Sequence, residues 1–532
     1  MENTRKSLWP DILAALLLSA PVFILYLSHC VWAAHKGLSP TGFIQYDMPY
    51  YMANARQYSD GLHNWIAYAN PYDFAPDSPR IYFQPLMFLF GLIMRLTSTD
   101  PGILFAITGL VFTVLAFVVL QRLLDNYCPS QDRTLRLYLL LIVAWGGGCL
   151  TLLSSWVSLR HGVPFDPFRY DPGQGTWFFN LGRNFIYPTE AFYHLVVLLL
   201  FLAVLLRKTL WALAMVWLLA LSTPFTGLQY SLILLVWAVF ERFILNSKVF
   251  KTTTVLQFCG PAAFVFLYYL IFLPSFPSHR ALLEQWHANW TMEWRTVLGA
   301  YCLMGLLVLL RCASKKKLLE CFANPFNRFL VLSAVISFLL AKHELFMSPR
   351  QPIHFTRGHI WLPLCLLGLP VIAGLWREIA SHKRKLALLG AALAFALIVL
   401  FDNMVFFWVS CHRPNGIYLS SADRQVFRLL SNRHERPVVV SDDEVLSYLA
   451  ATYSSARPYL GHASNTPNAK EKRQAVEAFF AGGLIPKDLQ NRVFLVITRR
   501  HGDKLLADAR FEKVASVDGL TVFSRKAGKD PG

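Results

Sequence analysis

Long apolar runs separated by short hydrophilic breaks dominate the first ~410 residues of the chain. A bilayer crossing needs about 20 mostly apolar residues, and runs near this length recur about twelve times. They lie near 9–31, 82–97, 101–124, 135–157, 188–206, 209–222, 226–245, 255–274, 294–311, 327–342, 358–376 and 386–409. The pattern predicts a polytopic α-helical membrane protein with 11–13 transmembrane helices, and a transmembrane domain over 1–410.

Lysine and arginine gather in some of the hydrophilic breaks and not in others. The basic breaks are 121–136, 207–208, 241–251, 311–328 and 377–385. Cytoplasmic loops are enriched in these residues, so the other segments are predicted outside. These are a first outer loop 32–80, the outer loops 158–187, 274–293 and 343–357, and the tail after 410. Arg5 and Lys6 fit this topology only with 11 or 13 passes, or else the N-terminus lies outside.

The tail 411–532 alternates short β-type and amphipathic helical segments, which predicts a small soluble α/β domain. Strands are expected at 437–440, 457–460, 493–497, 512–517 and 520–525, with helices at 443–451, 468–481 and 503–509. Thr466 and Pro467 form a helix-start signal, since the hydroxyl can cap and proline suits the first helical position. With the topology above, we expect this C-terminal domain to be extracytoplasmic. The sequence has no cysteine after Cys411, and this lack of disulfides in an outward domain, with the compact loops, favours a multi-pass protein of the plasma (inner) membrane.

The composition agrees with this membrane assignment. Hydrophobic residues make up 55% of the chain and charged residues 15%, and the mean hydropathy is +0.41. The net charge of +18 could indicate nucleic acid, but the basic residues sit mainly in breaks between apolar runs. The tail has no basic stripe interleaved with aromatic residues, so we expect no nucleic-acid partner. The cysteines show no metal-ligand spacing.

Asp47 is the most informative residue of the first outer loop. Pro49 marks the start of a helix expected over 49–59, which is rich in tyrosine and suited to the membrane interface. Asp47 would lie at the positive end of the helix dipole, which favours an ionised carboxylate. Such a carboxylate can act as a general base or hold a divalent cation. The alternative is that Asp47 only caps the helix.

Two further segments complete a resemblance. One is the run Pro85-Leu86-Met87-Phe88-Leu89-Phe90-Gly91-Leu92-Ile93-Met94-Arg95-Leu96, which follows the first loop. The other is Gly461-His462-Ala463-Ser464-Asn465-Thr466-Pro467 in the tail, which is similar to a Gly-His-x-x-x-Thr-Pro segment of uncharacterised prokaryotic members of one superfamily. With the N-terminal span and the Asp47 loop, the chain resembles the GT-C glycosyltransferases, integral membrane enzymes that use polyprenyl-phosphate-linked sugars.

This resemblance implies a polyprenyl-phosphate-linked sugar donor and a lipid, glycan or protein acceptor in the bilayer. It also implies that the first-loop acid, here Asp47, is catalytic or binds a metal, with Mg²⁺ or Mn²⁺ as the candidate cation. Many members carry a second acid beside the first. Met48 occupies that position here, so the paired version is absent.

Other outer segments offer candidate partners for Asp47. The loop 158–187 holds Asp166, Asp171 and Arg183, although an Asp before Pro is also a common turn starter. Glu190 and His194 are one helical turn apart and share a face, with Glu190 as a second candidate catalytic acid. Contact with lipid headgroups is their alternative role.

The segment 348–359 concentrates hydrogen-bond donors that suit a phosphate. Its candidates for donor-phosphate binding are Arg350, His354, Arg357 and His359. We therefore predict an inverting sugar transferase in which these residues hold the donor and Asp47 activates the acceptor. His462 is a further candidate, or else only a strand end. The alternative function is a non-enzymatic lipid or polysaccharide transporter, or an assembly subunit of the envelope.

Overall fold

The computed structural model describes residues 9–171, 179–247, 250–286, 290–381, 385–413, 416–433 and 436–526. The chain forms two compact units. Unit 1 comprises Met1–Leu25, Thr108–Leu267 and Ala288–Arg413, and unit 2 comprises Tyr26–Ile107, Tyr268–His287 and Pro414–Gly532. Unit 2 resumes close to the predicted boundary at 410. It also takes in two segments from the first 410 residues, which include the first outer loop.

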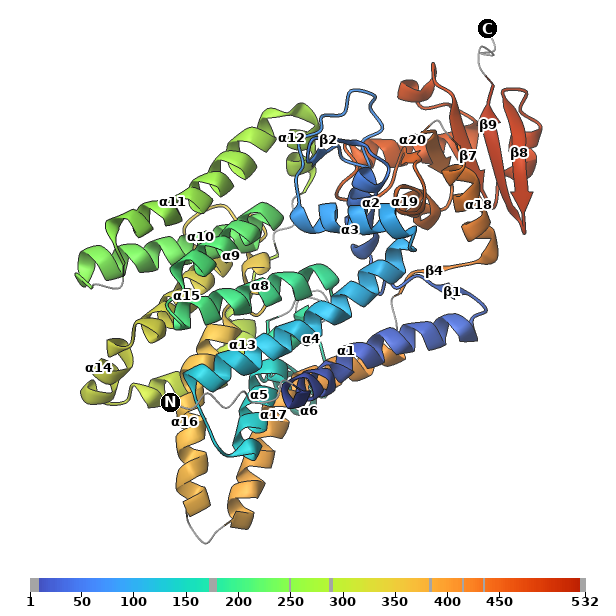
Figure 1. Ribbon diagram of the computed structural model, residues 1–532. Helices are drawn as coiled ribbons and strands as arrows, with labels where there is room; N and C mark the ends of the chain where they lie inside the picture. The colour runs from blue at the N-terminus through green and yellow to red at the C-terminus, as the bar shows by residue number, and fades with distance from the viewer. Residues whose placement is uncertain are drawn as a thin grey trace. The chain divides into compact units, whose positions relative to one another are not determined.

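Unit 1 is helical in its described residues (Figure 1). Its helices are α5 (Arg133–Trp145), α6 (Leu150–His161), α7 (Leu181–Asn184), α8 (Pro188–Leu205), α9 (Thr209–Ser222), α10 (Pro224–Val239), η1 (Phe240–Ile244), α11 (Thr252–Val265), α13 (Trp294–Arg311), α14 (Lys315–Ala323), α15 (Pro325–Ala341), η4 (His343–Leu345), η5 (Pro352–Phe355), α16 (Trp361–Ser381) and α17 (Lys385–His412). Three helices contain a boundary between the units along the chain, namely α1 (Trp9–His35), α4 (Pro101–Tyr127) and η2 (Phe266–Phe272).

Eight helices of the described residues are long and apolar enough to cross a membrane, and up to ten spans result if each of two bent helix pairs counts as one. The bent pairs are α5 with α6, at 69°, and α14 with α15, at 98°. Two shorter apolar helices, Pro85–Thr97 and Thr209–Ser222, coincide with two further predicted runs. The protein is therefore a polytopic helical membrane protein.

The break between α5 and α6 shows how closely the unit 1 helices approach. The Cys149 backbone N–H donates to the carbonyl of Gly299 on α13, with N and O 2.6 Å apart. A Cβ on Gly148 would lie 2.1 Å from that same oxygen. Only glycine allows this approach, as is common where membrane helices pack backbone to backbone.

Unit 2 contains a five-stranded sheet with the order β6-β5-β7-β9-β8 (Figure 1). The strands are β5 (Val438–Ser441), β6 (Arg457–Pro458), β7 (Phe494–Thr498), β8 (Phe511–Val517) and β9 (Leu520–Arg525). β5 pairs in parallel with β6 and β7, while β9 is antiparallel to β7 and β8. All five strands lie where the sequence predicts them. Asp518 and Gly519, both with positive φ, form the predicted tight turn between β8 and β9.

The helices of the tail are α18 (Ser421–Ser431), α19 (Glu444–Tyr453), α20 (Ala469–Gly482), η6 (Lys487–Leu489) and α21 (Gly502–Leu506). Three of them match the predicted helices. The sequence analysis missed α18, which begins with a reciprocal capping box between Ser420 and Asp423. It also placed a cap at Thr466, and this is wrong. α20 starts later, after Asn468, and the Thr466 hydroxyl instead accepts a hydrogen bond from the Gly461 N–H at 3.1 Å.

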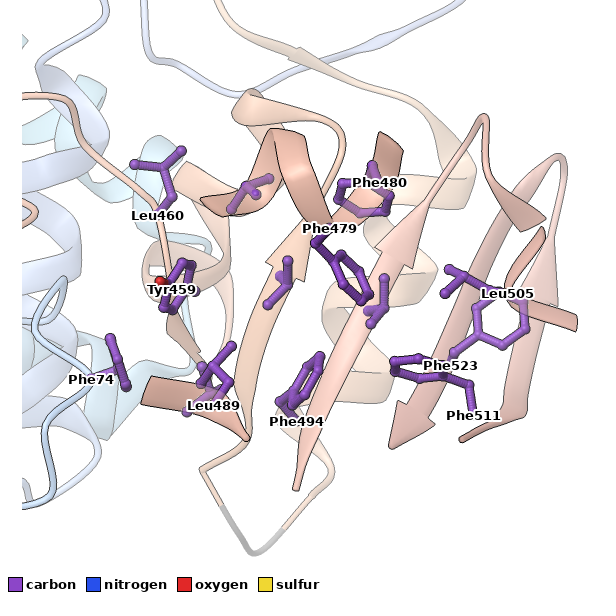
Figure 2. Packing of buried hydrophobic residues seen from close by; sticks show 14 residues of the cluster. Phe74, Tyr459, Leu460, Phe479, Phe480, Leu489, Phe494, Leu505, Phe511 and Phe523 are labelled. Carbon is purple, nitrogen blue, oxygen red and sulfur yellow. The ribbon is translucent and has the colours of Figure 1, made fainter. Parts of the chain in front are cut away.

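Apolar side chains gather in several buried clusters of unit 2, two of which include strands of the sheet. Figure 2 shows one of them, in which the Phe479 ring of α20 packs edge-on to that of Phe494 of β7, with centroids 6.2 Å apart. Phe74 of the first outer loop belongs to this cluster. The other cluster joins α18 and α19 to inward-facing residues of β5, β7 and β9. The first outer loop is therefore part of the same hydrophobic core as the tail.

The remaining elements of unit 2 are short except for α2 of the first outer loop and α3, which follows that loop. They are β1 (Ser39–Pro40), α2 (Met48–Ser59), β2 (His63–Asn64), β3 (Ala67–Tyr68), α3 (Pro85–Thr97), η3 (Leu273–Ser275), α12 (Pro277–Gln285) and β4 (Tyr418–Leu419). α2 packs on α3, where a Cβ on Gly91 would lie 2.4 Å from the Ala55 carbonyl oxygen. β1 pairs with β4, which attaches the start of the loop to the start of the tail.

Candidate functional site

Asp47 precedes helix α2 but does not cap it. Its side chain makes no capping hydrogen bond, so the alternative that Asp47 only caps the helix does not describe this residue. Its Oδ1 instead lies 3.0 Å from Nε2 of His462. The Asp47 side chain is 59% exposed, whereas that of His462 is 5% exposed. A solvent-accessible carboxylate is thus held by a buried imidazole from the tail.

The hydrogen bonds of His462 determine which ring nitrogen faces Asp47 as a donor. Nδ1 accepts from the Ser464 backbone N–H at 3.1 Å and pairs with the side-chain amide nitrogen of Asn465 at 2.9 Å. An atom that accepts from these donors carries no proton in neutral imidazole. The proton therefore resides on Nε2, which donates it to Asp47, and the carboxylate is held as an oriented acceptor.

Four tyrosines surround this pair. Tyr46 and Tyr448 have ring centroids 5.0 Å and 5.3 Å from that of His462, and 4.9 Å from one another. The Tyr448 hydroxyl donates to the Tyr46 carbonyl and accepts from the Tyr50 N–H, which connects α19 to the start of α2. Tyr50 stacks on Tyr72. Burial raises the pKa of Tyr50, so its phenol stays protonated at neutral pH.

The Gly-His-x-x-x-Thr-Pro segment builds this arrangement. A Cβ on Gly461 would lie 2.4 Å from Cδ1 of Tyr72, so the tail and the first loop can approach only because this residue is glycine. Gln285 of α12 donates to the carbonyl of Thr466, with N and O 2.8 Å apart. Asn70 donates to the carbonyl of Asn465 at 2.8 Å. These two hydrogen bonds fix the second half of the segment to α12 and to the first outer loop.

The residues around Asp47 do not supply a complete metal site. No group of three or more His, Cys, Asp or Glu side chains that could hold a metal ion occurs among the described residues. The His462 nitrogen nearest to Asp47 is the protonated one, and a protonated nitrogen cannot ligate. The Mg²⁺ or Mn²⁺ predicted from the resemblance therefore stays a prediction, and none of the chemistry proposed below depends on it.

Unit 1 brings together a second group of the predicted residues. Arg357 forms an ion pair with Glu190 at the start of α8, and its guanidinium also lies 2.8 Å from Nδ1 of His354. Glu190 and His194 share the predicted face, with Nδ1 of His194 3.9 Å from a Glu190 oxygen. Both are buried. Segment 348–359 and the start of α8 thus form one charged cluster, which we call the Glu190–Arg357 cluster (Glu190, His194, His354, Arg357 and His359).

Two histidines of this cluster stack on one another. His194 and His359 have ring centroids 5.0 Å apart and nearly parallel planes. Nδ1 of His359 bonds to the Tyr230 hydroxyl at 3.1 Å, while its buried Nε2 has no hydrogen-bond partner in the described part of the chain. A polar atom in that state can receive a ligand group without breaking an existing bond. Arg350 is exposed, and its backbone N–H donates to Nε2 of His343 at 2.8 Å.

Asp171 and Arg183 lie apart from this cluster, in a buried network with residues of α17. Arg183 donates to Asp171 at 2.5 Å, to Asn403 at 2.9 Å and to the carbonyl of Asp402 at 3.0 Å. The Asp402 carboxylate accepts from the N–H groups of Leu150 and Thr151 at the start of α6. The Arg183 donors are thus occupied by protein acceptors, which indicates a structural role.

Asp402 and Asn403 are not among the site residues predicted from the sequence. Both lie inside the predicted run 386–409, where a carboxylate is expensive to bury without partners. An acid in the middle of an apolar run was the available signal. Asp166 has a simpler role, because its Oδ1 accepts from the Phe168 N–H at 2.9 Å, as in an ordinary Asx turn.

Comparison with solved structures identifies the fold. The oligosaccharyltransferase AglB from Archaeoglobus fulgidus, in complex with an inhibitory peptide and a dolichol-phosphate, matches 93% of this chain and 70% of its own, with a TM-score of 0.54 at 12% identity. A second AglB structure, tethered with an acceptor peptide, gives a TM-score of 0.52 over 94% of this chain and 70% of its own, at 13% identity. ArnT from Cupriavidus metallidurans, bound to undecaprenyl phosphate, matches 97% of this chain and 99% of its own, with a TM-score of 0.50 at 12% identity.

The chain therefore has the GT-C fold that the resemblance predicts. No protein-family model matches the sequence, and no curated protein matches it.

Proposed function

We propose that this protein is a membrane glycosyltransferase that moves a sugar from a polyprenyl-phosphate-linked donor to an acceptor hydroxyl, with inversion at the anomeric carbon. The observation that carries the proposal is the exposed carboxylate of Asp47, held by the Nε2–H of buried His462. The GT-C fold supports it, since AglB and ArnT were solved with dolichol-phosphate and undecaprenyl phosphate. Function belongs to sites and not to folds, so the residues must carry the argument.

Asp47 is proposed as the catalytic base. Oδ1 of Asp47 accepts a hydrogen bond from His462. The carboxylate is exposed, so its other oxygen, Oδ2, can accept the proton of an acceptor hydroxyl. The acceptor oxygen forms a bond to the anomeric carbon while the bond from that carbon to the phosphate oxygen breaks. The proton moves to Asp47, and the polyprenyl phosphate leaves with the bonding electrons. His462 keeps the carboxylate oriented and gives up no proton of its own.

The Glu190–Arg357 cluster, together with Arg350, is proposed to hold the donor phosphate. Arg357 and Arg350 offer guanidinium groups, which match phosphate oxygens in geometry and charge. The unpartnered Nε2 of His359 offers a further contact. Glu190 is proposed to orient Arg357 through their ion pair, so that charge on the departing phosphate meets a preorganised donor. The positive-inside pattern favours the extracytoplasmic face for this chemistry.

The test is transfer of radiolabelled sugar from polyprenyl-phosphate donors to membrane acceptors, with wild type compared with Asp47→Asn at matched expression. Asparagine keeps the shape and removes the base, so we expect the rate to fall about 10²–10⁴-fold. Asp77→Asn is the matched control, because Asp77 is an exposed acid in the same loop. It should leave transfer unchanged.

Other results would redirect the proposal. Undiminished transfer by Asp47→Asn would remove Asp47 from catalysis and leave Glu190 as the candidate acid. Absence of transfer by folded wild type with every donor would favour the transporter or assembly alternative. The buried ion pairs of unit 1 would then be examined as parts of a translocation path.

A further inference from the structure

Unit 1 contains a cavity that lies outside the residues discussed above. Its volume is about 220 Å³, and its lining comes from the end of α8, the start of α9, the end of α10, α11 and the start of α15. These helix ends adjoin the breaks 207–208, 241–251 and 311–328, which the sequence analysis predicts to be cytoplasmic. The cavity is therefore associated with the basic ends of membrane helices.

Two adjacent basic residues line this cavity. Arg207 and Lys208 form the turn between α8 and α9, and both are exposed. Neither makes an ion pair or a side-chain hydrogen bond within the described residues. Arg207 adopts φ +56°, in the left-handed region where glycine is the usual residue after a helix. An arginine there accepts backbone strain that glycine would avoid, so its side chain is a candidate for a role of its own.

A tryptophan in the lining of the cavity provides one more hydrogen-bond donor. Trp237 lines it and is only 4% exposed, and its indole Nε1–H has no hydrogen-bond partner in the described ranges. Buried indole N–H groups usually find a partner. Phe250 packs edge-to-face on the indole ring at 4.7 Å, which holds the ring in place. An unpartnered donor beside two cations is suited to an anion.

Apart from Thr209 and Asn324, the other residues of the lining are apolar. Phe250, Phe258 and Phe326 are buried in it. Next to the basic turn, Leu210 and Trp211 of α9 are 74% and 65% exposed, as expected for side chains that face lipid. Typical pockets for whole drug-sized ligands are about 300–1,000 Å³, so this smaller cavity suits a headgroup whose chains remain outside.

We propose that this cavity binds the phosphate headgroup of an anionic glycerophospholipid from the surrounding bilayer. Arg207 and Lys208 neutralise the phosphate, and the Trp237 N–H donates to one of its oxygens. The acyl chains then lie along the apolar surface of α9. This site is independent of the proposed transferase chemistry.

The experiment uses the purified full-length protein in detergent. Retained lipid is measured by native mass spectrometry after addition of phosphatidylglycerol or phosphatidylcholine. In parallel, a photoreactive phosphatidylglycerol is crosslinked and the labelled peptides are mapped. We expect preferential retention of phosphatidylglycerol, with crosslinks in residues 203–212 and 324–326. Equal retention of both lipids, or crosslinks confined to other segments, would overturn the proposal.

Three variants test whether the charges and the indole N–H of the cavity, and not the general fold of the protein, determine lipid retention. The double variant Arg207→Asn, Lys208→Gln removes both charges, and asparagine tolerates the left-handed backbone. It should lower phosphatidylglycerol retention about tenfold, and Trp237→Phe should lower it less while keeping the aromatic packing. Lys316→Gln removes an exposed lysine of α14 outside the cavity and should have no effect.

Two further outcomes count against the site. If Lys316→Gln lowers retention as much as the double variant, the binding is only diffuse attraction to basic residues. If inorganic phosphate binds to the wild type and not to the double variant while phosphatidylglycerol is not retained, the cavity binds free phosphate and not a lipid. If the double variant does not fold, Trp237→Phe and the crosslinking map on wild type still decide the question.

Discussion

Asp47 and His462 are 415 residues apart in the chain, and their side chains meet at 3.0 Å. Within unit 2 this contact connects the first outer loop to the tail. The lack of a side chain at Gly461 allows the close approach, and the Thr466 hydroxyl accepts a hydrogen bond from the Gly461 N–H. The tail therefore contributes directly to the candidate site. It does more than cover the loop.

We predict that His462→Ala slows sugar transfer about 10- to 100-fold, because a hydrogen bond to a charged group is worth about 1.5–3 kcal/mol. His462→Gln retains an N–H donor and should recover part of the rate. The measurement is the transfer rate with the KM for the donor, and the KM should stay unchanged, since His462 acts through Asp47. His501→Ala is the control, because it removes another histidine–aspartate contact of the tail, at 2.9 Å. An equal loss in His501→Ala would mean that the tail had only been destabilised.

Gly461→Ala should destabilise unit 2. The new Cβ would lie 2.4 Å from the Tyr72 ring, so the loop or the ring must move. Overpacking of this kind costs about 1–3 kcal/mol, visible as a lower thermal unfolding midpoint. Gly482→Ala is the matched control, since the nearest atom to its Cβ lies 4.0 Å away. Equal midpoints for Gly461→Ala and wild type would show that the segment adjusts freely.

The Arg183–Asp171 pair should be a large determinant of stability in unit 1. Arg183→Met leaves the carboxylate of Asp171 buried without its cation, which costs about 3–5 kcal/mol. The double variant Arg183→Met, Asp171→Leu removes both charges and should recover part of that loss. Unfolding midpoints of both variants and of Arg160→Met, an exposed arginine of α6, provide the test. If Arg183→Met were as stable as wild type, water would have to reach the Asp171 carboxylate in the variant.

The buried ammonium group of Lys472 should make the free energy of unfolding depend on pH. Burial lowers its pKa to about 8 from the usual 10.5, although Asp73 and Asp488 oppose the change. Below pH 8 the lysine is charged in both folded and unfolded states, so the full cost of burying the charge is present. Between pH 8 and 10.5 the unfolded chain binds more protons, so raising the pH relieves this cost.

Lys472→Met should therefore stabilise unit 2 by about 2 kcal/mol at pH 7, and by progressively less as the pH approaches 10.5. The measurement is the difference in unfolding midpoint between the variant and wild type across this range, which cancels the other titrating groups. The competing term is the attraction of the ammonium to the Phe74 ring, 4.5 Å away. A destabilised variant at pH 7 would mean that this attraction exceeds the cost of burial.

Local pattern determined most of the elements of this protein. The apolar runs gave the membrane helices, and the alternation in the tail gave β5, β7, β8 and β9. Such signals repeat within a few residues, so they can be read along the chain. The importance of Asp47 also followed from its neighbours, since it precedes Pro49 and a tyrosine-rich helix.

Tertiary structure alone decided which polar groups meet. His462 and Asp47 come from segments at opposite ends of the sequence, and Arg183 reaches Asn403 across 220 positions. Contacts of this kind leave no periodic trace, because each depends on one residue in each segment. The same limit explains why Thr466 does not cap α20 as its neighbours predict, whereas Asp402 does carry a local signal, as an acid inside an apolar run. A polar side chain takes the partner that folding brings near, and only the packed chain determines that partner.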